Sequence, residues 1–442
     1  MVRSRALRAS VGRTGEVFDA ATAFVAAAVA GVTLFLPVAV RPRPAATSYQ
    51  LTGLLNNVPR SAALAVIVAV IVAVVIATTS RPLLGWATAA AGSIAQLINH
   101  LAAPAVPSAD LLTTQNYLDA VCGAVVLGAL GAVALPRPLP AAGFALGGIS
   151  FFAVGGLAQM LGLGADLPAM SETPPRWLIA ATAVLLIMGT LRNRAPTEEH
   201  ERPPTNGELP LAPIFAATVL AVTVLGATEW LGRQFGKAPD DPHVVGTGIV
   251  VAATIVGASV AALLLPGRDG VGVYLAVSLT AAADAVGYAP RPGWAVAVLI
   301  AVAGAGIAAG NRIPSTFAAI ALVAGIALFA LTAAAGASRA GFMAISSVIA
   351  LTAGYCCGVA RPHETSSGVL ALAALYLPTV VSVSPGAVRN WHGEESPSIT
   401  PAIAAFALTM GSALGLAALY RFRPGETRRP GGQPGSEPFT GM

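Results

Sequence analysis

The chain has 442 residues, of which 55% are hydrophobic and only 10% are charged, where an average soluble domain has roughly 25% charged residues. So much apolar surface excludes a water-soluble fold and predicts a protein whose solvent is lipid. The formal net charge of +5 does not indicate nucleic-acid binding, because the arginines are scattered at the ends of apolar runs instead of forming one stripe.

The long apolar runs predict transmembrane helices, because every backbone amide in lipid must find its hydrogen-bond partner within the chain. Polar and apolar residues do not alternate in these runs, which excludes the strands of an outer-membrane barrel. The basic arm before the first run resembles a signal peptide, and we expect an uncleaved signal anchor because a second span follows. Cys122, Cys356 and Cys357 all fall within apolar runs, which argues against a disulfide framework or a CxxC metal site.

Fourteen runs are long enough to cross a hydrocarbon core of about 30 Å. The first six, in chain order, are Ala20–Val40, Ala62–Thr79, Leu83–Leu101, Tyr117–Leu135, Leu139–Leu163 and Trp177–Leu191. The others are Leu211–Leu231, Val244–Leu265, Val271–Tyr288, Trp294–Ala309, Ser315–Ala335, Gly341–Val359, Gly368–Ser384 and Pro401–Tyr420. Trp177–Leu191 and Trp294–Ala309 are short, so twelve or thirteen spans remain an alternative count.

The placement of basic residues in the short loops predicts that both termini are cytoplasmic. With this orientation sixteen arginines lie inside, whereas eight arginines and Lys237 lie outside. Arg41, Arg43 and Arg60 in the first outer loop are exceptions to this preference for basic residues on the inside. The location that follows is the cytoplasmic membrane, with the lipid bilayer as the first partner of the chain.

A charged segment, residues 192–210, divides the apolar chain into two lobes. The inner-loop residues Arg81, Arg137 and Arg192 are matched after this hinge by Arg312, Arg361 and Arg421. We therefore predict a six-helix lobe over residues 1–191, a cytoplasmic hinge over 192–210, two inserted helices over 211–265, a second six-helix lobe over 266–420 and a disordered cytoplasmic tail over 421–442. An evenly spaced polytopic chain without any repeat would place its basic loops in the same way.

This 6 + 2 + 6 layout resembles the major facilitator superfamily, and within it the fourteen-span drug:proton antiporters. In the loop after the second span, Arg81 and Gly85 match the family pattern, but its acidic residue is missing. In the corresponding loop of the last six spans, Asn311 stands where the family prefers Asp. In the fourth span, Asp119 stands four residues before Gly123, where the family has an arginine associated with proton coupling. The resemblance implies secondary transport by alternating access, without an enzymatic reaction.

Ionised side chains inside hydrocarbon are costly, so each one is a candidate for substrate or ion binding. Asp284 is the foremost candidate, because a rise of about 1.5 Å per residue puts it roughly 20 Å into its span; a carboxylate satisfied by a neighbouring helix is the structural alternative. Asp119 and Glu229 lie near outer helix ends, where solvation at the membrane rim is the simpler interpretation. Gln96, Asn99 and His100 share one helix face, and Gln159 completes the candidates; all four also suit hydrogen bonds between helices.

Other patterns have a packing interpretation or are missing. The pairs Gly306/Gly310, Gly354/Gly358 and Gly411/Gly415 are spaced for close helix packing. The sequence contains no GxxxxGK[ST] and no HExxH motif, so we expect no ATP hydrolysis, no metal and no cofactor. We predict an exporter of an amphipathic or hydrophobic small molecule. A lipid flippase, and a scaffold or assembly subunit with a membrane-protein partner, are the alternatives.

Overall fold

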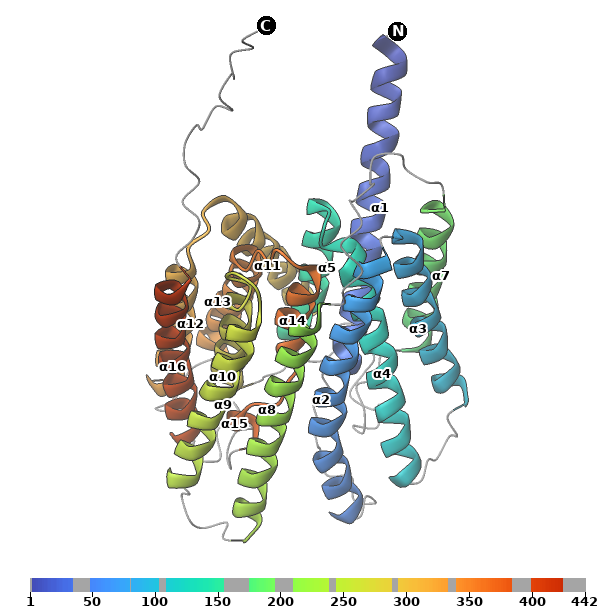
Figure 1. Ribbon diagram of the computed structural model, residues 1–442. Coiled ribbons are helices and arrows are strands. Elements are labelled where there is room, and N and C mark those ends of the chain that lie inside the picture. Colours follow the sequence, from blue (N-terminus) through green and yellow to red (C-terminus); the bar gives the residue numbers. More distant parts are fainter. Residues whose placement is uncertain are drawn as a thin grey trace, which may run out of the picture.

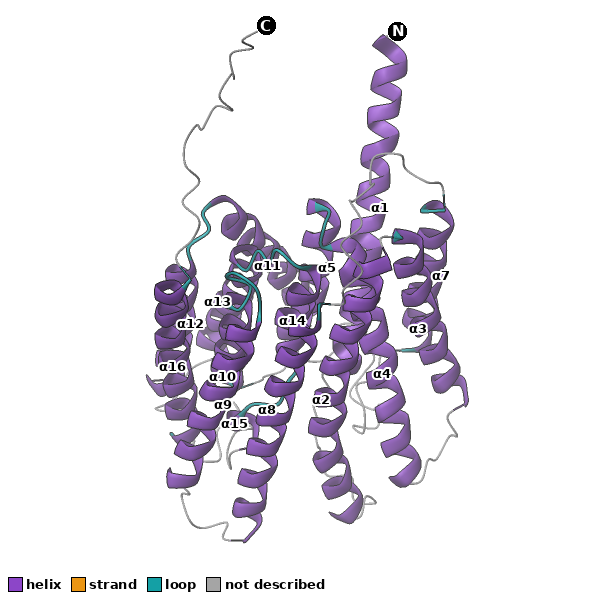
Figure 2. Ribbon diagram, viewed as in Figure 1, coloured by secondary structure: helices purple, strands orange, loops and turns teal. Residues whose placement is uncertain are grey.

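The computed structural model describes residues 2–34, 48–79, 81–102, 109–154, 175–194, 210–237, 244–287, 293–332, 339–383 and 399–423. All the regular structure in these ranges is helical (Figure 2), which confirms the prediction of an all-α protein. Most of the predicted hinge, residues 195–209, and the tail 424–442 lie outside the described residues. Their structure therefore stays a prediction.

Six helices come before the hinge, and we call them the first bundle. They are α1 (Val2–Leu34), α2 (Ser48–Thr79), α3 (Pro82–Ala102), α4 (Ala109–Ala134), α5 (Pro138–Val154) and α7 (Arg176–Arg192). Two further helices follow the hinge, α8 (Leu211–Lys237) and α9 (Val244–Leu264). The last bundle consists of α10 (Val271–Val286), α11 (Gly293–Arg312), α12 (Thr316–Thr332), α13 (Arg339–Val359), α14 (Thr365–Ala374), α15 (Val380–Val383) and α16 (Thr400–Phe422).

The described helices have the length and composition of membrane spans. Seven of them are at least 18 residues long and sufficiently apolar to cross a bilayer, and four shorter apolar helices accompany them. Many large apolar side chains are exposed on the outer surface, for example Val245 and Leu414, as expected where lipid replaces water as the solvent. The chain is thus a multi-pass membrane protein, while the count of fourteen spans stays a prediction.

Two helices begin well before the residues predicted from hydropathy. We expected spans from Ala62 and Tyr117, but α2 begins at Ser48 and α4 at Ala109. Hydropathy alone placed polar residues such as Arg60 and Asn116 in loops. The helices continue through them because the polar side chains find partners on neighbouring helices: Arg60 donates to Glu229, and Asn116 donates to Ser61.

The predicted span Gly368–Ser384 is not one helix. It is divided into α14 and α15, and residues 375–379 between them are not helical. Pro378 explains the break, because proline has no backbone N–H and disfavours the helical conformation of the residue before it. Irregular backbone at membrane depth is tolerated only where protein buries it or where it lines a cavity.

Both bundles have the same arrangement of neighbours. In the first bundle the contacting pairs are α1–α5, α2–α4, α3–α4, α3–α7, α1–α4 and α1–α7. In the last bundle, with α14 and α15 taken as one broken helix, the corresponding pairs are α10–α14, α11–α13, α12–α13, α12–α16, α10–α13 and α10–α16. Each of these six principal pairs thus has its counterpart at the same ordinal positions in the last bundle, whereas the α4–α5 contact of the first bundle and the α10–α12 contact of the last are not matched to the same extent.

The contacts between the bundles are reciprocal. The second helix of the first bundle, α2, contacts the fifth of the last bundle, α14, and the fifth helix of the first bundle, α5, contacts the second of the last, α11. A two-fold axis that relates parallel repeats produces such exchanged pairs. The two additional helices pack on each other, with α8 also against α2 and α9 also against α16.

The start of α1 and the end of α16 lie at the same end of the molecule (Figure 1). We call this the terminal end and the opposite end the distal end. The arrangement agrees with the prediction that both termini are on one side of the membrane, but it does not decide that this side is the cytoplasm.

The glycine spacing predicted for close helix packing is confirmed where α11 crosses α13. A Cβ atom built on Gly354 would lie 2.0 Å from the carbonyl oxygen of Ala303, and one built on Gly306 would lie 2.2 Å from that of Leu351. The two backbones are therefore in direct contact, which only residues without a side chain allow.

The crossing of α11 and α13 gives a test of stability. Gly354→Ala should destabilise the protein by about 1–3 kcal/mol, because the added methyl group forces the two backbones apart. The matched control is Gly325→Ala in α12, where a Cβ meets nothing within 4 Å; this change should be neutral or stabilising, since alanine favours a helix. Thermal unfolding of both variants in detergent measures the difference, and equal melting temperatures would contradict the prediction.

Candidate functional site

Asp284 occupies the end of a helix that is buried on all sides. Every other residue of α10 is buried, and Asp284 alone is partly exposed. Its Oδ2 accepts a hydrogen bond of 2.5 Å from the Thr379 hydroxyl, and Thr379 belongs to the non-helical link between α14 and α15. The Thr379 hydroxyl oxygen also accepts a hydrogen bond from the Ser382 amide, 3.1 Å long. Asp284 is thus joined to the broken helix of the same bundle.

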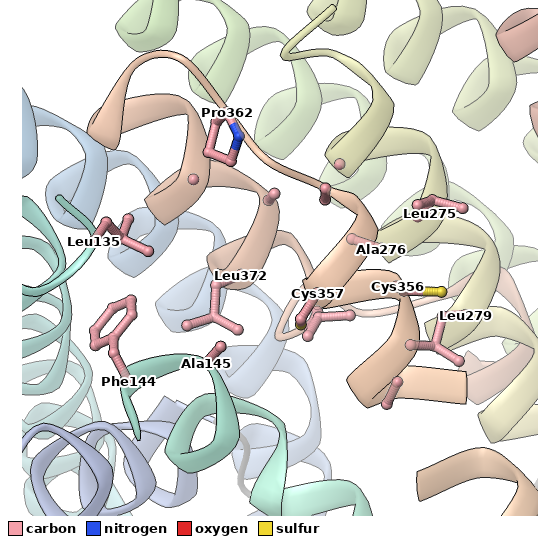
Figure 3. A pocket seen from close by; sticks show the side chains of 16 residues that line it. Leu135, Phe144, Ala145, Leu275, Ala276, Leu279, Cys356, Cys357, Pro362 and Leu372 are labelled. Atoms are coloured by element: carbon pink, nitrogen blue, oxygen red, sulfur yellow. The ribbon is translucent and has the colours of Figure 1, made fainter. Parts of the chain in front are cut away.

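A cavity lies between the bundles and is lined almost entirely by apolar side chains (Figure 3). The lining residues come from α5, α10, α13 and α14 and from the end of α4, and include Phe144, Leu275, Cys357 and Leu372. Its volume of about 70 Å³, measured to the centres of water-sized spheres, holds a few water molecules.

Asp284 does not line this cavity. The residues that α10 contributes are Gly272, Leu275, Ala276 and Leu279. At about 100° per residue, Asp284 lies roughly a third of a turn away from the centre of that face. The predicted ion-binding carboxylate and the apolar cavity therefore lie on different faces of the same helix.

Three of the predicted polar residues meet between α3 and α4, and a fourth, Gln96, lies nearby on α3. Asp119 lies with its Oδ2 2.9 Å from His100 Nε2, and its Oδ1 accepts a hydrogen bond of 2.9 Å from the Asn99 side chain. Gln96 is 1% exposed and lies on the same face of α3. We expected Asp119 to be solvated at the membrane rim, and this is wrong: the residue is 8% exposed, because α4 extends ten residues beyond it and α3 covers its carboxylate.

Glu229 also has protein partners instead of rim solvation alone. It accepts hydrogen bonds from Arg60 at 2.5 and 3.2 Å and from Arg233 at 3.3 Å. The pair of Arg60 with Glu229 joins α2 to α8 near the distal end. Because Arg60 has this partner within the helices, it does not follow the distribution of basic residues that is expected of loops. The last predicted residue, Gln159, lies outside the described residues, and its role stays a prediction.

Sequence reasoning missed a pair of buried carboxylates near the terminal end. In the first bundle, Asp19 of α1 lies 2.7 Å from Arg137 and 3.6 Å from Arg192. In the last bundle, Asp269 precedes α10 and accepts hydrogen bonds from the backbone amides of His363 and Glu364 at 2.8 and 3.1 Å. Each aspartate thus ties the first helix of its bundle to the link between the fourth and fifth.

A signal for these residues was present in the sequence. Asp19 is the last acidic residue before a long apolar run, and Asp269 stands next to Arg268 in a short link between two such runs. We had interpreted the basic residues only as determinants of topology. Their side chains also hold the helices together at the terminal end, through hydrogen bonds to carboxylates and to backbone carbonyls such as that of Gly267, which accepts from Arg423.

The described side chains include no group of three or more His, Cys, Asp or Glu residues that is suitably placed for a metal ion. No family model matches the chain, and no curated protein matches it either. Two solved structures of a transporter are similar over most of their length. One is the xylose transporter XylE from E. coli in a partially occluded inward-open conformation, with 12% identity, 93% of this chain and 97% of that chain covered, and a TM-score of 0.47.

The other is the proton:xylose symporter XylE of the major facilitator superfamily bound to 6-bromo-6-deoxy-D-glucose. It has 12% identity to this chain, covers 93% of this chain and 94% of its own, and gives a TM-score of 0.49. At this identity, and with both TM-scores below 0.5, the likeness establishes neither the fold nor the function of this chain.

Removal of the Thr379 hydroxyl tests the link to Asp284. Thr379→Val should destabilise the protein by on the order of 1–3 kcal/mol, because the Asp284 carboxylate loses a donor and the Ser382 amide loses its acceptor. Thr332→Val is the matched control, since the Thr332 hydroxyl donates only to a carbonyl of its own helix at an exposed site. The measurement is thermal unfolding in detergent, and equal stability of the two variants would remove Thr379 from this role.

The terminal end of the last bundle gives a prediction that depends on pH. Burial and the nearby charge of Asp269 raise the pKa of the Glu364 carboxyl. A carboxyl whose pKa is higher in the folded than in the unfolded state is destabilising when ionised, above the folded pKa, and has no such cost when protonated in both states.

Glu364→Gln should therefore raise the melting temperature at neutral pH. The gain should shrink as the pH falls toward the ordinary glutamate pKa of about 4.3. Glu16→Gln, on an exposed part of α1, is the control. A gain at Glu364 that is independent of pH would contradict the electrostatic cause.

Proposed function

We propose that the protein is a secondary transporter that moves an amphipathic or hydrophobic small molecule across the membrane by rocking two helical bundles about the space between them. One observation carries this proposal: six neighbour pairs recur at the same positions in both bundles, and the contacts between the bundles are exchanged pairs. Repeats related in this way suit alternating access, because each bundle can move as a body around a central site.

The character of the substrate is inferred from the cavity. Its lining of leucine, alanine, phenylalanine and cysteine side chains suits an apolar or amphipathic molecule better than a sugar, which needs many hydrogen-bonding partners. Since the cavity holds only a few water molecules, a larger substrate requires that the bundles move apart. The ion pair of Arg60 with Glu229, which joins α2 and α8, is one contact that such a motion would strain or break.

Asp284 is the residue we propose for ion or substrate binding in the last bundle. A carboxylate in a buried helix favours a proton, a cation or a cationic substrate, and its bond to the Thr379 link connects its protonation to the geometry of the broken helix. For Glu229 the ion pairs with Arg60 and Arg233 favour a structural role.

The remaining parts of the proposal rest on the sequence alone. They are export from the cell, a location in the cytoplasmic membrane with both termini inside, and membership of the fourteen-span antiporter-like branch of the major facilitator superfamily. A lipid flippase is expected to line its path with cationic side chains. Arg60 is one of the few arginines that could serve, and it is paired with Glu229, so this alternative has less support.

The function is tested by reconstitution into liposomes with an imposed pH gradient. The probes are a cationic dye, ethidium, and a set of uncharged hydrophobic dyes. We expect flux of at least one dye above that of empty liposomes. Asp284→Asn should lower this flux about tenfold or more, equivalent to about 1.4 kcal/mol, because the variant has no ionisable group there, whereas Glu16→Gln should leave it unchanged.

Other outcomes point to the alternatives. Absence of dye flux together with rapid movement of a fluorescent phospholipid between leaflets would replace the proposal with a lipid flippase. Absence of both, with a membrane protein that co-purifies in fixed proportion, would favour a scaffold or assembly subunit. Unchanged flux in Asp284→Asn would remove this residue from the mechanism but keep the transporter.

A further inference from the structure

The contact between His100 and Asp119 brings two ionisable side chains together inside the first bundle. Their atoms Nε2 and Oδ2 are 2.9 Å apart, and the side chains are 12% and 11% exposed. The other carboxylate oxygen of Asp119 accepts a hydrogen bond from Asn99, whose amide also donates to the carbonyl oxygen of Gln115 at 3.3 Å. Two neighbouring side chains of α3 thus converge on one buried carboxylate of α4.

Few other charges lie near this pair. The other titratable or charged side chains described near the distal end of the first bundle are Tyr117, Cys122, Arg60 and Arg176. Cys122 lies about one turn along α4 from Asp119 and is an electrostatic neighbour of it. Arg60 is paired with Glu229 and lies near Tyr117. Arg176 is exposed at the start of α7. In the described parts of α1, α5 and α14, which also pack on α4, no titratable side chain lies at this end.

The number of protons on the pair decides how much charge is buried. With one ionisable proton on the pair as a whole, the two side chains have no net charge, whether they are an ion pair or two neutral groups. Loss of this proton leaves a net negative charge, and gain of a second leaves a net positive charge, each of which is costly away from water.

The surroundings of the pair allow a proton to reach it. His100 is two residues from the end of α3, so the distal surface is close. Three buried side-chain atoms have no hydrogen-bond partner among the described residues: the nitrogen of Gln96, the oxygen of Asn116 and His100 Nε2, which lies close to Asp119 Oδ2 without a hydrogen bond to it. Buried polar atoms of this kind are the usual partners of internal water molecules.

We propose that His100 and Asp119 form a proton-binding site, held in place by Asn99 and loaded from the distal end of the molecule. The site is separate from Asp284 and from the cavity between the bundles, since the pair lies between α3 and α4 and lines no part of that cavity. Its role as the site of the coupling ion rests on the transport function proposed above.

The proton itself is the probe in the test. The full chain is labelled with ¹⁵N-histidine, placed in lipid nanodiscs and titrated by NMR. A variant with His200, His243, His363 and His392 replaced by Gln leaves the pair intact and His100 as the sole histidine. We expect the His100 ring signals to titrate in this background. Asp119→Asn should change the midpoint of this titration measurably, because the imidazole loses the carboxylate that lies 2.9 Å from it.

Glu229→Gln in the same background is the matched control, because it removes a carboxylate at the same end of the molecule without touching the pair; the His100 midpoint should not move. Infrared spectroscopy of the background variant supplies a second measurement that does not depend on how Asp119→Asn folds. We expect a carboxyl band that changes at the same pH as the His100 signal.

A His100 signal that does not titrate, a midpoint that Asp119→Asn leaves in place, or no carboxyl change at the pH of the His100 transition would each overturn the proposal. None of these measurements involves transport. The proton site can therefore fail while dye flux is observed, and it can be present in a protein that transports nothing.

Discussion

The requirement that each polar group in lipid be satisfied within the chain controls this structure. It explains why the described residues form helices, and why α2 and α4 continue through polar residues that hydropathy assigns to loops. Arg60 and Asn116 are tolerated there, and Asp119 within its predicted span, because each has a side-chain partner on another helix. The break between α14 and α15 obeys the same constraint, since the Thr379 hydroxyl donates to Asp284 and accepts from the Ser382 amide where the helix is interrupted.

Lipid as the solvent also determines how the helices pack against one another. Because lipid provides no hydrophobic drive between helices, contact depends on close approach and on interhelical hydrogen bonds. Close approach is concentrated in pairs such as α11 and α13, where Gly306 and Gly354 bring the backbones together. The hydrogen bonds and ion pairs are concentrated near the two ends, with Asp19 and Asp269 at the terminal end and Glu229 at the distal end. The interface between the bundles is apolar, and the cavity lies there, from Leu135 and Pro362 near the terminal end inward to Leu279 and Leu375.

The proposed transport mechanism assigns different tasks to these regions. The apolar cavity between the bundles accepts the substrate, Asp284 responds to an ion or a charged group in the last bundle, and the pair of His100 and Asp119 holds a proton in the first. The carboxylates of the terminal end tie the first helix of each bundle to the link between the fourth and fifth. Such ties suit bundles that move as rigid bodies, because they are made within each bundle and need not break when the bundles separate.

The sequence by itself determined the membrane class, the all-helical fold and the glycine spacing of α11 and α13, because composition and local periodicity are enough to decide them. It also named Asn99 and His100 on one helix face and Asp119 in the next span, but without a contact between the two spans. Only the tertiary structure decided that they meet, that Arg60 pairs with Glu229, and that Asp284 is bound by Thr379. The physical reason is that these contacts join residues 19 to 169 positions apart, and hydropathy carries no information about which faces of two helices turn toward each other.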